Sequence, residues 1–483
     1  MKSLISFSLA TLSLFTLLFS CIEEKDLYKG PDDNYNAYLY DYKTEATGIT
    51  AEFILTLNDE VSADVIDFEI PPLKYNKSWL FLLTQDDCSH SAYCVTWAAI
   101  NNKPIANVYS QISDRNLYYT SGHLYYNDMP NGTYTYNKTL GSTDGTGREV
   151  RFAFTTTVSA EENAMNEEVT VAPGFTKNEF RFFMKKMLLW NDVKEILTYG
   201  NSIAFHDVMA TNVQNVTDLT AHLATAQSII KEKLSGRTCK VLAEPSGIKT
   251  YLEAGNLYEE VKIMAGQSAG INLQPFKVAN DLTKNILKRQ LSNQIPQDVK
   301  AQMAQQALLT KENRTAINIG AHTTNKEFTD LLLWLNDTYG KDGDDTMWFP
   351  SLEEYYEYNY YRIHSKITKK VEGNVLKVTI TMPAAAAMYY PSLTVNLKGL
   401  TKNKVKSITS TDNVTGLSFG DYKEGLMLNM DCRKHLVELA THFVEKYEAN
   451  KTAGNESDAL YFVNMLKTSS IKSQLLKRIE TAL

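Results

Sequence analysis

The sequence has no excess of basic residues. It contains 49 Lys and Arg against 56 Asp and Glu, which gives a formal net charge of −7 at pH 7. Without a basic field there is little to attract a polyphosphate backbone, so we expect no nucleic-acid partner. Charged residues make up only 22% of the chain and hydrophobic residues 43%, a balance that excludes wholesale disorder. No repeat of fixed period is present, which excludes a solenoid.

Cysteine is scarce and is not spaced as a metal knuckle. The chain has five cysteines and no C-x-x-C pair, so a structural zinc site of that kind is not supported. A disulfide is permitted in an exported chain, but the sequence does not choose a pairing among the four cysteines beyond Cys21. The 28 tyrosines suit sugar-binding surfaces and ordinary strands alike.

The apolar run near the start of the sequence is too short to span a membrane. It extends from Leu4 to Phe19, against the roughly 20 apolar residues that a spanning helix needs. With Lys2 before it and small residues after it, residues 1–20 are expected to be a signal peptide. Leu18–Cys21 resembles a bacterial lipobox, and the acidic residues that follow resemble the export tag of surface lipoproteins. We therefore expect an outer-membrane, surface-exposed lipoprotein held in the membrane by lipid on Cys21, with residues 21–50 as its tether.

Strand and helix patterns alternate from residue 51 to residue 365. Trp79–Leu83 is a continuous apolar run of the kind that forms a buried strand, and shorter runs such as Ser202–Phe205 follow. Helical periods lie between these runs, and residues 278–312 are predicted to be helical throughout. This alternation predicts a mainly parallel α/β fold. From 366 to 483 we expect an accessory module of β-strands followed by helices.

Polar side chains recur where the predicted apolar strands end. Asp86 and Asp87 follow the first buried strand, and His206, Glu244 and His322 follow later ones. In a closed parallel barrel the carboxyl ends of the strands meet on one face, where active sites lie. Each of these residues alone is a weak signal, but all of them at strand ends indicate a site.

The motifs at these positions resemble those of the polysaccharide deacetylases, the NodB-homology carbohydrate esterases of family four. The resemblance covers about residues 75–365 and implies a partial or distorted (β/α) barrel. Five stretches carry it: Thr84–Asp87, Gly200–His206, Pro245–Gly247, Ile319–His322 and the segment from Trp348 to Glu354.

The resemblance implies a metal-dependent hydrolase that removes acetyl groups from an acetylated glycan at the cell surface. Asp86 would be the base, Asp87 and His206 the ligands of one divalent ion, zinc by family expectation, and His322 the acid. The same resemblance places three residues in substrate binding: Glu244, Pro245 and Trp348.

Two departures from the family pattern leave alternatives open. The family has a second His four residues after the first, where this chain has Ala210. The missing ligand could be replaced by a water or by one of three side chains: Asp207, His90 or Asn212. Oxygen ligands would favour a metal other than zinc. Glu244 also stands near the place of an Arg that pairs with the catalytic Asp, and a carboxylate beside Asp86 would raise the pKa values of the pair. A non-catalytic glycan-binding lipoprotein on a degenerate deacetylase scaffold is therefore the second hypothesis.

A third hypothesis is a serine esterase. Gly266–Gly270 matches the G-x-S-x-G nucleophile elbow, with Ser268 as the nucleophile and His322 downstream. The elbow requires a helix directly after the serine, and Asn272 and Pro275 make such a helix poor.

Overall fold

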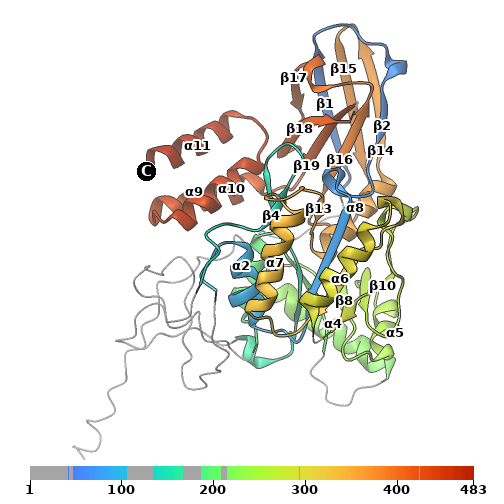
Figure 1. Ribbon diagram of the computed structural model, residues 1–483, viewed down its shortest axis with the longest axis vertical. Coiled ribbons are helices and arrows are strands. Elements are labelled where there is room, and N and C mark those ends of the chain that lie inside the picture. Colours follow the sequence, from blue (N-terminus) through green and yellow to red (C-terminus); the bar gives the residue numbers. More distant parts are fainter. Residues whose placement is uncertain are drawn as a thin grey trace, which may run out of the picture.

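The computed structural model describes residues 42, 47–105, 134–166, 187–207, 215–292, 294–423 and 425–482. They form a barrel-like parallel sheet surrounded by helices, a β-sandwich at one end of that barrel, and three helices at the end of the chain (Figure 1). Within these ranges, no helix combines the length and the apolar character needed to cross a bilayer.

The barrel is built from short parallel strands. They are β3 (Trp79–Gln85), β6 (Thr155–Val158), β7 (Ser202–Phe205), β8 (Val241–Ala243), β9 (Ile263–Gly266), β10 (Ile286–Lys288), β11 (Gln290–Leu291), β12 (Ile317–Ala321) and β13 (Met347–Trp348). Their order is β10-β9-β8-β7-β6-β3-β12-β11, and β13 pairs with the start of β3. Only Arg289 separates β10, which pairs with β9, from β11, which pairs with β12. One extended stretch therefore contacts both ends of the sheet and nearly closes it, which confirms the expected partial (β/α) barrel.

The alternation of side chains along β3 defines the two faces of the barrel wall. Leu80 and Leu82 belong to the apolar cluster that fills the barrel and continues into the sandwich. Trp79, Phe81 and Leu83 belong to the cluster beneath the surrounding helices. Because both faces are buried, the strand is apolar without interruption, as its sequence predicted.

Helices cover the outside of the barrel. They are α2 (Ala98–Ile100), α3 (Trp190–Thr198), α4 (Val216–Lys233), α5 (Lys249–Leu257), α6 (Ile295–Ala307) and α7 (Lys326–Tyr339). The buried side chains of α8 (Leu352–His364) belong instead to the cluster that continues from the barrel into the sandwich. The expectation that residues 278–312 are helical throughout is wrong, because residues 286–291 form β10 and β11 and only α6 is an α-helix there. Pairing with β9 and β12, which lie elsewhere in the sequence, decides the structure of this stretch, and a local pattern does not show such partners.

The β-sandwich consists of two antiparallel four-stranded sheets. One has the order β14-β15-β1-β17 and the other β18-β19-β16-β2. Their bounds are β1 (Ile49–Leu57), β2 (Asp67–Glu69), β14 (Lys366–Glu372), β15 (Val375–Met382), β16 (Ser392–Lys398), β17 (Val405–Ser410), β18 (Gly416–Tyr422) and β19 (Gly425–Asp431). β1 and β2, which the sequence grouped with the barrel, pair with β15, β17 and β16. The division at residue 365 stays a prediction, but these early strands are hydrogen-bonded to the later part of the chain.

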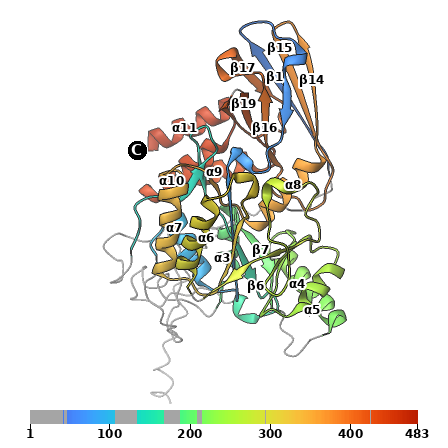
Figure 2. The same cartoon turned by 45° about the vertical axis from the view of Figure 1, so that its right-hand side comes forward.

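The sandwich and the carboxyl ends of the barrel strands lie at opposite ends of the barrel. β13 and α8 lie between the barrel and the sandwich (Figures 1 and 2), and the hydroxyl of Tyr358 in α8 donates to the carbonyl of Pro71 at 2.7 Å. β3 begins beside β13 and runs away from it. The carboxyl ends of the parallel strands therefore face away from the sandwich.

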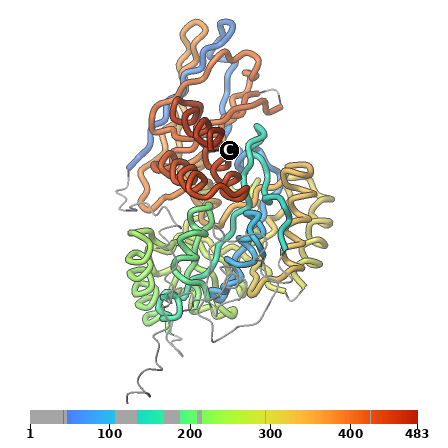
Figure 3. Tube along the Cα trace, turned by 90° about the vertical axis from the view of Figure 1, so that its left-hand side faces the viewer, coloured from blue at the N-terminus to red at the C-terminus, as the bar shows by residue number. Residues whose placement is uncertain are grey.

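Three C-terminal helices pack at the junction of the sandwich and the barrel (Figure 3). They are α9 (Leu436–Ala449), α10 (Ala453–Met465) and α11 (Ser470–Ala482). Asp458 of α10 is fully buried and bonds Lys103 Nζ and Arg151 Nη1, each at 2.6 Å, while the Tyr199 hydroxyl donates to it at 2.7 Å. One buried carboxylate thus joins α10 to three segments on the barrel side of the junction. A hairpin of β4 (Gly141–Thr143) and β5 (Glu149–Arg151) supplies the arginine.

The four cysteines beyond Cys21 are buried, and none of them forms a disulfide bond within the described part of the chain: Cys88, Cys94, Cys239 and Cys432. Burial raises the pKa of Cys88 to about 12, so this thiol stays neutral at pH 7. The cysteines therefore act as small apolar packing residues.

Candidate metal centre and active site

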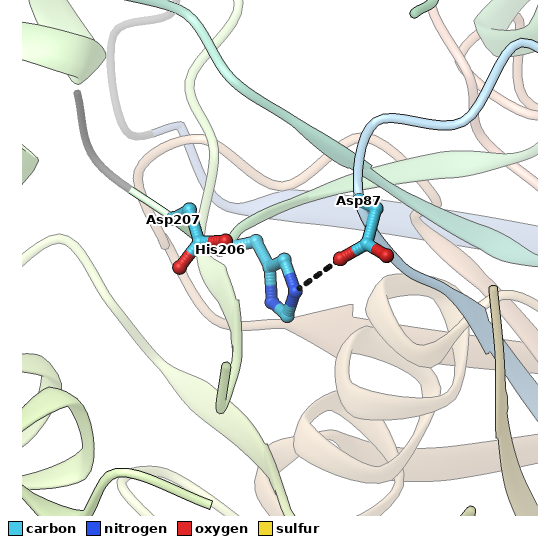
Figure 4. Close-up of side chains that lie close together, drawn as sticks. All are labelled: Asp87, His206 and Asp207. Carbon is cyan, nitrogen blue, oxygen red and sulfur yellow. Dashed lines mark ion pairs between the residues drawn. The ribbon is translucent and has the colours of Figure 1, made fainter. Parts of the chain in front are cut away.

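Three of the side chains predicted to form the site lie together at the carboxyl ends of the barrel strands. Asp87 follows β3, His206 follows β7 and His322 follows β12. The His206 Nε2 atom is 3.4 Å from Asp87 Oδ1, and the His322 Nε2 atom is 3.9 Å from Asp87 Oδ2. Figure 4 shows the carboxylate of Asp87 directed at the imidazole of His206. Segments more than 100 residues apart therefore meet around one carboxylate.

The backbone at Asp87 and Cys88 turns sharply to direct the Asp87 side chain. Both residues have left-handed conformations, with φ of +60° and +47°. This region is unfavourable for residues with a Cβ and is retained where the surroundings enforce it. Here the Cys88 amide donates to Thr157 Oγ1 at 2.9 Å, and the Cys88 carbonyl accepts from the Leu188 amide at 2.8 Å. Such local strain is common at functional sites.

His206 is oriented in the way that metal-ligating histidines usually are. Its side chain is only 3% exposed, and its Nδ1 atom is 3.0 Å from the carbonyl oxygen of Ala243. A carbonyl accepts but does not donate, so Nδ1 carries the proton of this hydrogen bond. The Nε2 atom is then the one that faces Asp87 and can bind an ion.

The charges of Asp87 and His206 stabilise each other. The hydrogen bond from His206 holds the pKa of Asp87 below its usual 3.8, against the effect of partial burial, with help from the nearby His322. Burial lowers the pKa of His206, but the hydrogen bond to Asp87 and the charge of Asp86 outweigh it and leave the pKa above 6.5. Without an ion, each of the two side chains therefore favours the charged form of the other.

Asp207 offers a third atom that could bind a metal ion. One atom each from Asp87, His206 and Asp207 lie within 4.8 Å of one another, with Asp87 and Asp207 on different sides of the imidazole (Figure 4). Two carboxylates and one imidazole suit a divalent cation. Of the other two side chains that the sequence left open, His90 is buried with its Nε2 atom 3.5 Å from Asp192 Oδ2, and Asn212 lies outside the described residues, as does Ala210.

Asp86 forms a fully buried ion pair with Arg289. Arg289 Nη1 is 2.6 Å from Asp86 Oδ1, and Arg289 Nη2 donates to the main-chain carbonyl of Glu244 at 2.9 Å. Arg289 was not among the predicted site residues, because it lies between β10 and β11, in the stretch predicted to be helical. The positive charge expected near the Glu244 position is therefore supplied by another strand of the barrel.

A comparison with known protein families identifies the family of this chain. Residues 51–480 match the family described as "Putative polysaccharide deacetylase". The chain belongs to this polysaccharide deacetylase family. The match extends over the sandwich and the C-terminal helices, which the resemblance over residues 75–365 did not cover. No curated protein matches the chain.

In this member of the polysaccharide deacetylase family, the Glu244 carboxylate binds the loop after β9. It accepts hydrogen bonds from the main-chain amides of Gln267, at 2.5 Å, and Ser268, at 2.8 Å, and from the Ser268 hydroxyl. Pro245 begins a turn in which its carbonyl accepts from the Ile248 amide at 2.9 Å. Both residues shape the loops beside the site, and their predicted contact with substrate stays a prediction.

The G-x-S-x-G segment does not form a nucleophile elbow. No helix starts directly after Ser268, and the chain instead reaches Ile271, which bridges Leu287 in parallel. The Ser268 hydroxyl donates to a carboxylate of the same loop region. The strand-to-helix turn that would expose and activate the serine is therefore missing from the described chain around this residue.

Trp348 lies at the other end of the barrel from the site. It is in β13, its ring is 1% exposed, and it makes edge contacts with Tyr355 at 5.8 Å and Tyr358 at 5.1 Å between ring centroids. The expected substrate contact by Trp348 does not fit this position. The Trp-containing segment instead packs α8 against the sandwich end of the barrel.

Proposed function

We propose that the chain is a metal-dependent deacetylase that removes acetyl groups from a glycan at the cell surface. The observation that carries the proposal is the meeting of Asp87, His206 and His322 at the open end of the barrel, with the Asp86–Arg289 ion pair next to it in the chain. Membership of the polysaccharide deacetylase family supports the reaction. The assignment of ligands, base and acid is our proposal.

Asp87, His206 and Asp207 would hold one divalent ion. The ion, when bound, supplies a Lewis acid that acidifies water and polarises the acetyl carbonyl. Zinc is the family expectation, while two carboxylate ligands would also suit a harder cation. Asp87 has a side chain 56% exposed, so substrate can approach it from solvent.

Asp86 acts as the base in this proposal and Arg289 positions it. The two donors of the guanidinium bind Asp86 Oδ1 and the Glu244 carbonyl, which fixes the carboxylate against two different strands. His322 acts as the acid: its side chain is 57% exposed, so its proton can reach a leaving amine. Asp86 thus takes the proton of the attacking water and His322 gives one to the amine.

The cellular setting is proposed from the start of the sequence. The signal peptide and the lipobox ending at Cys21 support a lipid-anchored protein of the outer membrane, and the following acidic residues support surface exposure. The substrate in that setting is an acetylated polysaccharide or oligosaccharide.

Removing the metal should abolish the activity. We expect purified protein to release acetate from an acetylated glycan, a chelator to reduce the rate to background, and added zinc or another divalent ion to restore it, because the proposal places catalysis at Asp87 and His206. Acetate release measured by an enzymatic coupled assay checks this. Ser268→Ala should leave the rate unchanged.

Two other outcomes would contradict the proposal in different ways. Activity that survives chelation but is lost in Ser268→Ala would indicate a serine esterase. Glycan binding without acetate release at any metal concentration would indicate a non-catalytic binding protein on the same scaffold.

A further inference from the structure

We propose that Gln85 is a positioning residue that sets the place of His322, the proton donor of the proposed function on which this inference rests. Gln85 is the last residue of β3 and is fully buried. By the alternation along β3 its side chain faces the outside of the barrel wall, where the π-helix Ala92–Trp97 and the loop after β12 pack. An amide here lies in a layer that is otherwise largely apolar.

The Gln85 amide is hydrogen-bonded to the main chain of His322. Its Nε2 atom donates to the His322 carbonyl at 3.0 Å, and it also bonds Ser91 Oγ at 2.7 Å and Thr324 Oγ1 at 3.2 Å. Its Oε1 atom accepts from the Thr96 hydroxyl at 2.8 Å. Acceptors on one side and a donor on the other fix which way the amide faces.

The loop that carries His322 is held on both sides of that residue. The Ala321 carbonyl accepts from the Asp86 amide at 2.7 Å, and the Thr324 amide donates to Ser91 Oγ at 3.0 Å. With the bond from Gln85, three hydrogen bonds, at residues 321, 322 and 324, tie this loop to residues 85–91. The His322 side chain itself is mostly exposed, so the position of its imidazole depends on where the main chain of His322 is held.

The acid and the metal ligands are positioned by different contacts. Asp87 and His206 are oriented by the turn at Cys88 and by the Ala243 carbonyl, whereas the hydrogen bonds of the Gln85 amide go to Ser91, Thr96, His322 and Thr324. Loss of the Gln85 amide should therefore displace His322 and leave the ligand pair in place. A purely structural role would instead lower the stability of the fold and affect all reactions of the enzyme alike.

The test compares two substrates that differ in their need for an acid. An acetamide releases an amine, which must take up a proton as the C–N bond breaks, whereas 4-nitrophenyl acetate releases a phenolate that leaves without one. In Gln85→Met we expect kcat on an N-acetylated glycan to fall about 10- to 100-fold, as is usual for a misplaced catalytic group. KM, bound metal and the rate on 4-nitrophenyl acetate should be unchanged.

Gln227→Met is the matched control. Gln227, on α4, is also a buried glutamine with hydrogen bonds to the main chain. Its Oε1 atom accepts from the Cys239 amide at 2.9 Å, and its Nε2 atom donates to the Cys239 carbonyl at 3.0 Å. It should leave the ratio of the two rates unchanged. Ser91→Ala is a milder second variant, because it removes the hydroxyl that Gln85 and Thr324 share, and it should lower the same ratio.

Each remaining outcome counts against the inference. Equal losses on both substrates, or no loss on the acetamide, would overturn the positioning role. If Gln85→Met does not fold, an unchanged rate ratio in Ser91→Ala overturns it. If the wild-type protein hydrolyses neither substrate, the proposed function itself is overturned. The variants, by contrast, test only the positioning role of Gln85.

Discussion

Replacing Asp86 by asparagine is expected to lower kcat for acetate release by a factor of about 10² to 10⁴, the usual contribution of a general base. The amide is nearly the same size as the carboxylate but accepts no proton from the attacking water. The ligands Asp87 and His206 remain, so the variant should still bind the metal. Steady-state acetate release, together with the metal content of the purified variant, measures both effects.

The Arg289 partner makes a folding control necessary. Asp86→Asn leaves a fully buried guanidinium without its counter-charge, and breaking a buried pair costs about 3–5 kcal/mol of stability. The double variant Asp86→Asn with Arg289→Gln removes that charge and should regain much of the stability without regaining activity. Circular dichroism and urea unfolding follow the fold. A folded Asp86→Asn with wild-type kcat would show that Asp86 is not the base.

Asp458→Asn is expected to destabilise the protein by about 3–5 kcal/mol, because it removes the charge that balances buried Lys103 and leaves buried Arg151 with only the more distant Glu149 carboxylate, at 3.5 Å. Lys103 and Arg151 both lie 2.6 Å from the Asp458 carboxylate, in the contact that joins α10 to the barrel side of the junction. The free energy of unfolding in urea measures the loss.

A surface ion pair provides the matched control. Arg478 bonds both carboxylate oxygens of Glu448, at 2.8 and 2.6 Å, but both side chains are more than a third exposed. Glu448→Gln should therefore cost only about 0.2–1 kcal/mol. Equal effects of the two substitutions would mean that the Asp458 cluster does not hold the C-terminal helices.

The same carboxylate predicts a specific loss of stability in acid. Burial raises the pKa of Asp458, but the charges of Lys103 and Arg151 outweigh it and lower the pKa from 3.8 to about 2. A carboxyl whose pKa is lower in the folded state stabilises the fold above its unfolded pKa and loses that contribution as the pH falls. Wild-type stability should therefore decline between about pH 4 and pH 2, and the decline should be shallower in Asp458→Asn.

The parts of the site that follow from local pattern were predictable. Asp87, His206 and His322 each come directly after a short apolar run, and parallel strands bring such positions to one face, so their meeting could be inferred without coordinates. The barrel followed from the alternation of strands and helices. Asp207 could be proposed only as one of several substitutes for the missing second histidine.

The parts that depend on distant pairing were not predictable. Arg289 lies in a stretch of mixed polarity whose strand character comes from β9 and β12, so the cation beside Asp86 was missed. β1 and β2 pair with strands more than 300 residues later, which no local period indicates. Trp348 was expected at the substrate because of its motif, whereas its burial against Tyr355 and Tyr358 depends on where α8 packs.

The location of a bound ion tests the central claim most directly. We predict that a crystal grown with zinc or another divalent ion shows an anomalous scattering peak in contact with the Asp87 carboxylate and His206 Nε2, at the roughly 2.0–2.2 Å typical of such ligands. A carboxylate oxygen of Asp207 should complete the protein ligands. A metal-saturated crystal in which Asp87 and His206 still bond each other directly, with no peak beside them, would contradict the account.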